Sequence, residues 1–340
     1  MKNGVVVTLL ALVLFAPATF ADERIGIFET VLESSLSFSE TDEALQRAMA
    51  DSDLQLHASH VVRVPNERHQ AKIYVLTAPA FVAAAAAESP RTISAQILRI
   101  AVFTAGAEQK TFVNMANPVA HAMVYYADSS NYAALRAAAS DVAGQIRQLV
   151  KKVPGNSLSV QAPPLRTEKH YRKYKGDGPA RMMAKFRTWE KSQLPITMGT
   201  ADTFDGMVEH VAAALASGTI AGAEEVDGWE VIARIHLRDD AVYFGLTNPF
   251  IEDKMIRINS QFRSDVIEGA APFPGVDHVA ALPTDLLVVD DGYETLVLHY
   301  GQMWRMQLYF WDSGYRAFTA NVNVPNKIAN SIEAAVTAQR

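Results

Sequence analysis

Two segments of the chain repeat one pattern, and this repetition constrains the fold more than any other feature of the sequence. Apolar residues with the spacing of a helix face occur once in each segment: Phe38, Leu45 and Met49, then Phe204, Val211 and Leu215. Residues 76–79 read Leu-Thr-Ala-Pro and residues 246–249 read Leu-Thr-Asn-Pro, each where a strand is expected to pass into a helix. A duplicated sheet-and-helix unit explains both observations.

Periodicity and turn residues predict the elements of each unit. In the first unit we expect strands over residues 26–35, 54–64, 72–77, 97–104 and 111–115, and helices over 38–49, 79–87 and 131–152, with Ser39 as the first N-cap. In the second unit we expect a helix opening at Phe204, strands over 229–237, 242–247, 286–289, 295–300 and 303–311, and helices over 249–262 and 325–338. Asp291-Gly292 predicts a type I′ hairpin.

These elements define an α+β fold of two similar sheet-plus-helix units joined by a basic helical connector. The predicted boundaries are 1–21 for a signal peptide, 22–160 for the first unit, 161–199 for the connector and 200–340 for the second unit. Each unit has enough residues to bury a hydrophobic core of its own.

Short stretches of both units resemble the bacterial domain-of-unknown-function family 302. In the second unit these are residues 244–249 (Phe-Gly-Leu-Thr-Asn-Pro), 254–256 (Lys-Met-Ile), and Leu282-Pro283 leading into 286–289; in the first they are 97–104, 112–115 and Asn117-Pro118. Ala78 stands where the family has Asn, and residues 161–198 have no place in its pattern. The resemblance implies tandem, divergent copies of a compact α+β fold and pairing of units, which leaves a homo-oligomer open. It implies no established activity.

The first 21 residues have the order of a secretory signal: Lys2, an apolar run over 5–15, then Pro17 and small residues ending at Ala21. The apolar run is too short to span a bilayer about 30 Å thick, so we expect cleavage after Ala21 or Ala18 rather than a permanent anchor. The mature protein is then exported, without a transmembrane span. The periplasm is the expected location, and an extracellular fate is the alternative.

The chain has no cysteine and a net charge of −6. Without thiols it forms no disulfide and no metal site built on thiolates. An acidic, exported protein is a poor candidate for nucleic acid, whose partners carry basic surfaces. We therefore expect packing alone to hold the fold, and no nucleic-acid partner.

Two Asn-Pro turns follow predicted strands, at Asn117-Pro118 and Asn248-Pro249. An asparagine side chain can cap the following helix, and the first N–H groups of a helix can also receive an anion. Thr77 and Thr247 place hydroxyl groups beside predicted strand-to-helix junctions. Helix capping is the simpler explanation of these turns; if a small ligand binds, we expect it at the junctions.

Residues 303–311 form the densest group of aromatic and thioether side chains. As a strand, this segment would place Arg305, Tyr309 and Trp311 on one face. That face mixes polar and aromatic groups as binding surfaces do, whereas the opposite face is ordinary core. We expect these three residues to contact a small ligand or a protein partner.

The predicted connector is strongly basic, since residues 166–191 contain nine basic and three acidic residues. A helix opening at Pro179 would gather apolar residues on one side. We favour a helix that packs across the two acidic units. The alternative is contact with a membrane surface or a partner through five residues: Arg181, Lys185, Phe186, Arg187 and Trp189.

Motifs for catalysis or cofactor binding are absent from the sequence, including GxSxG, SxxK, HExxH, GxxxxGK[ST] and a GxGxxG after a strand. His57 and His60 would lie on opposite faces of a strand, so we expect no metal site there. Acidic pairs such as Asp239-Asp240 fall at predicted turns, where aspartate is favoured by local hydrogen bonding. We expect no cofactor.

The leading hypothesis is an exported, non-catalytic protein that binds a small molecule or an envelope protein. One alternative is a hydrolase or isomerase whose site lies between the two units and is drawn from four residues: His236, His299, Asp277 and Asp285. A second alternative is a membrane-surface module that acts through the basic connector.

Overall fold

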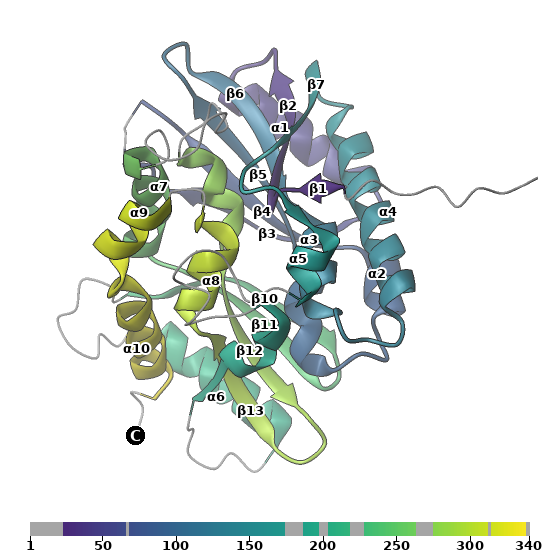
Figure 1. Ribbon diagram of the computed structural model, residues 1–340, viewed down its shortest axis with the longest axis vertical. Coiled ribbons are helices and arrows are strands. Elements are labelled where there is room, and N and C mark those ends of the chain that lie inside the picture. Colours follow the sequence, from purple (N-terminus) through teal and green to yellow (C-terminus); the bar gives the residue numbers. More distant parts are fainter. Residues whose placement is uncertain are drawn as a thin grey trace, which may run out of the picture.

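The computed structural model describes residues 23–65, 68–173, 186–196, 203–217, 228–262, 275–311 and 314–337. This part of the chain has an α+β fold, as predicted, with two large antiparallel sheets and a small two-stranded one. The six-stranded sheet comes from the first half of the chain and fills the upper half of Figure 1, and the five-stranded sheet fills the lower half.

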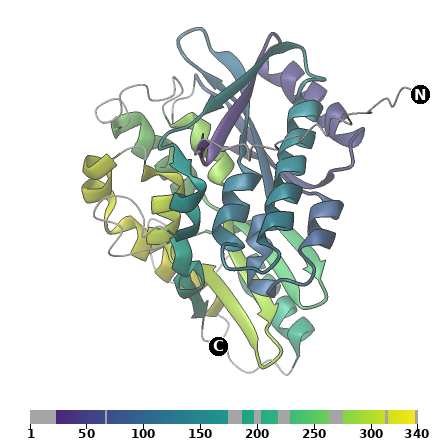
Figure 2. The same ribbon diagram turned by 45° about the vertical axis from the view of Figure 1, so that its right-hand side comes forward.

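The six-stranded sheet has the strand order β3-β4-β5-β6-β2-β7. Its strands are β2 (Phe28–Ser34), β3 (Gln55–Val62), β4 (Ala71–Thr77), β5 (Leu98–Ala105), β6 (Lys110–Ala116) and β7 (Gly155–Gln161). The helical segments of this half are α1 (Phe38–Ala50), α2 (Pro79–Ala84), the 3-10 segment η1 (Pro90–Gln96), α3 (Pro118–Tyr125) and α4 (Tyr132–Val150). Helix α4 packs against α1, α2 and α3, and Figure 2 shows these helices gathered beside the sheet.

The five-stranded sheet has the order β10-β11-β12-β13-β9. Its strands are β9 (Gln193–Ile196), β10 (Glu230–Arg238), β11 (Ala241–Thr247), β12 (Thr284–Asp290) and β13 (Thr295–Tyr300). The helical segments of this half are α6 (Phe204–Ala216), α7 (Pro249–Phe262), the 3-10 segment η5 (Val276–Ala281), α8 (Gln302–Tyr309), α9 (Gly314–Asn321) and α10 (Val324–Thr337). Helices α7 to α10 lie together on the left of Figure 1.

The two halves share one continuous hydrophobic core. Short segments are exchanged between them, because η1 of the first half packs on β11 and β12 while η5 of the second half packs on β4 and β5. Each half therefore buries apolar surface against the other.

Helix α1 begins at Phe38, as predicted, but its N-cap lies two residues before the predicted one. Its N-cap is Ser37 rather than Ser39: the Ser37 hydroxyl accepts from the Glu40 N–H, and the Glu40 carboxylate accepts from the Ser37 N–H at 3.0 Å. This reciprocal pair satisfies two backbone donors that a helix start leaves open. Ser39 already lies inside the helix.

The turn between β12 and β13 is longer than predicted. Asp290 pairs with Thr295, so four residues connect the strands instead of the two of a type I′ turn. The Asp291 carboxylate accepts from the N–H groups of Tyr293 and Glu294, and Gly292 has a φ of 88°. Local hydrogen bonding to aspartate therefore shapes a wider loop, while strand pairing occurs where it was predicted.

Residues 303–311 were predicted as a strand, and this prediction is wrong. Gln302–Tyr309 form helix α8, in which Arg305 and Tyr309 are 4% and 2% exposed. Trp311 follows the helix, is partly buried, and packs edge-on against Phe318. A helix that is buried on most of its surface shows no polar face, so apolar periodicity cannot separate it from a buried strand.

The predicted connector contributes several elements. β8 (Arg166–Thr167) pairs with β1 (Arg24–Ile25), α5 (Glu168–Lys173) follows, η3 (Phe186–Ser192) comes next, and β9 then joins the second sheet. Arg181 and Lys185 lie outside the described residues, as do the side chains of Phe186 and Arg187. Trp189 is 5% exposed and stacks at a tilt on Tyr125. Within the described ranges, no helix combines the length and the apolar character needed to cross a bilayer.

Candidate functional site

The strand-to-helix junctions hold the predicted threonines and asparagines, and all four side chains are buried and engaged. Asn117 caps α3 by accepting from the Val119 N–H, and Asn248 accepts from the Ile251 N–H at the start of α7. Thr77 hydrogen-bonds to His57, and Thr247 donates to the Glu252 carboxylate at 2.8 Å. Capping and side-chain pairing thus account for these four residues.

A buried ionic cluster joins the two halves at the centre of the molecule. Asp285 on β12 accepts from the Arg99 guanidinium on β5 at 2.5 Å, and both side chains are 1% exposed. The Tyr243 hydroxyl on β11 donates to the same carboxylate oxygen at 2.9 Å. Arg305 on α8 lies 3.4 Å from the other oxygen of Asp285. One carboxylate therefore faces two guanidinium groups.

The neighbours of this cluster are held in their neutral forms. Burial lowers the pKa of His121, and the positive charges of Arg99 and Arg305 lower it further. Burial raises the pKa of Tyr309 against the pull of the same two arginines. The Tyr309 hydroxyl and Nε2 of the neutral His121 are hydrogen-bonded at 2.9 Å. The cluster of Arg99, Asp285 and Arg305 consequently carries one positive charge more than it carries negative charges.

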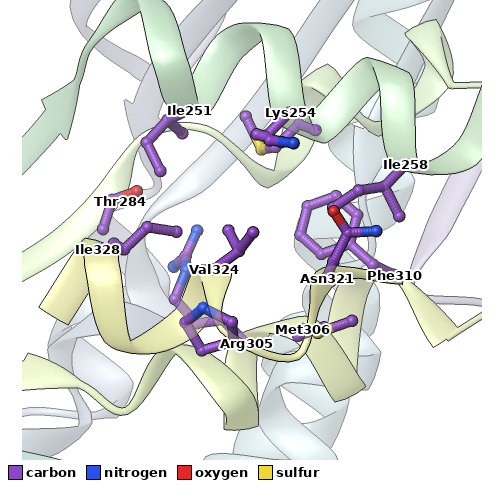
Figure 3. A pocket seen from close by; sticks show the side chains of 12 residues that line it. Ile251, Lys254, Ile258, Thr284, Arg305, Met306, Phe310, Asn321, Val324 and Ile328 are labelled. Atoms are coloured by element: carbon purple, nitrogen blue, oxygen red, sulfur yellow. The ribbon is translucent and has the colours of Figure 1, made fainter. Parts of the chain in front are cut away.

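A pocket opens beside Arg305 in the second half of the molecule (Figure 3). It holds about 480 Å³, part of it open to solvent. Of twelve lining residues, eight are apolar: Ile251, Met255, Ile258, Met306, Phe310, Val324, Pro325 and Ile328. The polar ones are Lys254, Thr284, Arg305 and Asn321, so no acidic side chain is among the described residues that line it. Apolar walls with a few convergent polar groups are typical of small-molecule sites.

The pocket depends on the position of Arg305. The Arg305 guanidinium donates to the backbone oxygen of Ala281 at 2.8 Å and lies over the Tyr309 ring, 5.2 Å from its centroid. Figure 3 shows the side chain extending into the space between α7 and α10. Arg305 therefore belongs both to the buried cluster and to the pocket wall.

A second polar contact between the halves involves Glu252 of α7. Its carboxylate accepts from the Arg63 N–H at 2.7 Å, and its other oxygen lies 2.7 Å from Nε2 of His60 on β3. Burial would raise the pKa of Glu252, but the hydrogen bonds from His60, Arg63 and Thr247 outweigh it and lower the pKa. The hydrogen bond to Glu252 in turn raises the pKa of His60 against the effect of burial.

The stability that His60 contributes is expected to fall as pH rises. Its raised pKa means that this contribution is complete below the ordinary pKa of 6.5 and is lost as pH passes the folded-state pKa. Glu252 contributes above its ordinary pKa of 4.5, and this contribution is lost at lower pH. The His60→Gln variant should be less stable than the native protein by on the order of 1 kcal/mol near pH 5.5, and by less near pH 8.5. Urea denaturation across this range measures the difference.

His57 gives a matched control on the same strand. Burial lowers the pKa of His57, so the folded state holds its proton less tightly than the unfolded chain does. His57 therefore lowers the free energy of unfolding most at low pH. The difference in unfolding free energy between His57→Gln and the native protein should change with pH in the opposite direction to that of His60→Gln. Equal slopes for the two variants would contradict the assignment of the His60–Glu252 pair.

The four residues of the hydrolase or isomerase hypothesis lie in different surroundings. Asp277 is buried on η5, with its carboxylate 3.1 Å from Nδ1 of His278. His236 is exposed on β10, and His299 on β13 contacts Glu333 of α10 at 3.1 Å. Asp285 faces Arg99, whereas His299 pairs across the sheet with Leu286, so the two side chains point to opposite faces. Among the described residues, no group of three or more His, Asp or Glu side chains is placed to hold a metal ion.

Sequence reasoning missed most of the buried cluster. Arg305 and Asp285 were singled out, but Arg99, Tyr243 and His121 were not assigned to a site. Arg99 lies in an apolar stretch, Leu-Arg-Ile-Ala-Val-Phe, where a single charge inside a strand predicted to be buried was the available signal. The partner of that charge lies 186 residues away and leaves no local trace.

Comparisons with known proteins give one structural similarity. No protein family matches the chain, and no curated protein sequence matches it at a significant level. The crystal structure of an uncharacterized conserved protein, DUF302, from Bacillus stearothermophilus is similar at 15% sequence identity and a TM-score of 0.30. The match covers 37% of this chain and 98% of that protein. Similarity of this extent assigns neither a family nor an activity to the chain.

Proposed function

We propose that the chain is an exported, non-catalytic protein that binds a small, largely apolar molecule in the pocket lined by α7, α8 and α10. The observation that carries this proposal is the pocket, whose described lining comprises eight apolar and four polar residues. Binding needs a preformed apolar cavity and a few polar groups to orient the ligand. The order of residues 1–21 supports export, with the periplasm as the proposed location.

A binding role is favoured over catalysis by the chemistry of the lining residues. Catalysis of hydrolysis or isomerisation needs a nucleophile or an acid–base pair within hydrogen-bond reach of the substrate. The described lining residues provide one hydroxyl, one amide and two cations, without a carboxylate or an imidazole. A protein partner from the cell envelope is the other occupant that the sequence left open. The small, mainly apolar pocket between helices favours a small molecule over it.

We further propose that the two halves are divergent copies of one module. Both sheets arise from the same succession: a strand, a helix, a hairpin, a helix, a 3-10 segment and a second hairpin. In both, the first strand pairs with the last strand of the second hairpin, giving the same strand order. The six-stranded sheet has β7 in addition.

The contacts between the halves support a two-fold relation of these copies. β4 and β11 both end in Leu-Thr before a helix that opens with proline. Counted from these ends, Val75 pairs with Arg99 and Gly245 pairs with Asp285, so Arg99 and Asp285 occupy equivalent positions. Equivalent positions meet each other only at a two-fold axis, as in a symmetric dimer. The exchange of η1 and η5 is reciprocal in the same way.

The binding proposal is tested with an uncharged apolar probe, 1-decanol, and thermal unfolding of the protein purified from the exported fraction. The mass of the purified protein is expected to be that of the chain without its first 21 residues. Decanol should raise the unfolding temperature of the native protein, since a ligand at one hundred times its Kd stabilises by about 2.7 kcal/mol. Met255→Trp, which fills the pocket, should abolish this shift. Val322→Trp, at a residue that is 36% exposed and does not line the pocket, should retain it. Equal shifts in both variants, or none in the native protein, would refute the proposal.

A further inference from the structure

The charges around the pocket are of one sign. Lys254 and Arg305 line it, and no acidic residue is among the described lining residues. Lys254 is partly exposed, and its ammonium group lies 5.7 Å from the centroid of the Phe250 ring. It has no ion pair with any described residue. The pocket therefore presents two cations at its wall.

The guanidinium of Arg305 is only partly neutralised by the protein. Asp285 is the acidic group beside it, and that carboxylate is closer to Arg99, at 2.5 Å against 3.4 Å. The Tyr243 hydroxyl also donates a hydrogen bond to the Asp285 carboxylate. Since His121 is held neutral, the cluster keeps an excess positive charge at a group that is 4% exposed. A buried charge without a full counter-charge is costly, and a bound anion removes that cost.

The donors of Arg305 suit a carboxylate. A guanidinium has five N–H donors in a planar fork that matches a carboxylate in a bidentate geometry. One nitrogen of Arg305 donates to Ala281, and the other terminal nitrogen faces Asp285 at a distance longer than that of a close ion pair. The hydroxyl of Thr284 and the amide of Asn321 also line the pocket (Figure 3). The remaining walls are apolar and would cover a hydrocarbon chain.

We propose that the ligand is an amphipathic carboxylate: an anionic head held by Arg305 and Lys254, with an apolar chain along Ile251, Ile258 and Ile328. This inference rests on the proposed binding function and adds the charge of the ligand to it. The uncharged wall alone would accept an alcohol as readily as an acid. The positive charges of Lys254 and Arg305 are what would make the pocket prefer the acid.

Binding of decanoate and 1-decanol to the native protein tests the inference, by calorimetry at pH 7.5 and low salt. Decanoate is expected to bind at least tenfold more tightly than decanol, and added salt should reduce the difference because screening weakens the ionic contact. Equal affinities would overturn the inference while leaving the binding function intact. Failure of both probes to bind would overturn both.

Variants of the two cationic residues show which charge binds the carboxylate head group. Arg305→Met should abolish the preference for decanoate but retain decanol binding, and Lys254→Met should reduce the preference several-fold. Lys327→Met is the matched control, because Lys327 is exposed on α10 and does not line the pocket. An unchanged preference in both Lys254→Met and Arg305→Met would overturn the inference. If Arg305→Met does not fold, Lys254→Met and the native comparison decide it.

Discussion

Replacing Asp285 by asparagine is expected to destabilise the protein by about 3–5 kcal/mol, the range for breaking a buried ion pair by removing one partner. Asparagine keeps the shape of the side chain but removes the one charge that faces both Arg99 and Arg305. Two guanidinium groups would then remain buried without a carboxylate. Urea denaturation at neutral pH, followed by tryptophan fluorescence, measures the loss.

The cluster also predicts an asymmetry between its two ends. Arg99→Met leaves Asp285 with Arg305 and with the Tyr243 hydroxyl, so it should cost less than Asp285→Asn. In a double-mutant cycle the combined loss should be smaller than the sum of the single losses. Asp240→Asn is the control, because it breaks a partly exposed pair with Arg238 and should cost no more than about 1 kcal/mol. Additive losses, or a larger loss for Arg99→Met, would contradict the shared-carboxylate arrangement.

Trp189→Ala is expected to cost about 3–5 kcal/mol, as for other large aromatic side chains removed from a core. Trp189 comes from the segment predicted as a connector, yet its ring lies 5.2 Å from that of Tyr125 on α3. Its removal would leave a cavity between the first half and the segment leading into β9. Leu194→Ala is the control, since Leu194 is 38% exposed on the neighbouring strand and should cost far less.

The same variant separates packing from a membrane role. If Trp189 were a membrane contact, Trp189→Ala would leave the unfolding free energy nearly unchanged and reduce sedimentation with anionic liposomes. If it is a core residue, the unfolding free energy falls and sedimentation of the folded protein is unaffected. The measured pair of values therefore distinguishes the two roles of this residue.

The hairpins and most helices could be predicted from the sequence because their signals are local. A helix from Pro249 to Phe262 was predicted because proline favours the first turn of a helix, and α7 has these bounds. The strands on either side of Gly106 and of Asp239-Asp240 have alternating or apolar runs bounded by turn residues. Errors at this level were small and had local causes, such as the capping box of Ser37, which places the N-cap of α1 two residues before the predicted one.

The errors with large consequences came from segments buried on all sides. Helix α8 was predicted as a strand, and its Arg305 and Tyr309 were expected on an exposed face. In the fold this helix lies against η3 and α10, and its polar side chains are satisfied by other buried groups. No pattern within residues 302–311 indicates this, because the polar partners belong to β12, η5 and α3.

By itself the sequence determined the α+β class and most strands and helices of each half, since periodicity and turn chemistry act over a few residues. It did not predict β9, which lies in the segment predicted as a connector and completes the second sheet. Only the tertiary structure decided that the halves share one core and that Arg99 pairs with Asp285. It also placed Arg305 in the pocket wall, where Asp285 neutralises its charge only in part. The reason is distance along the chain. Burial of one half against the other and the pairing of charges 186 residues apart depend on how whole sheets come together.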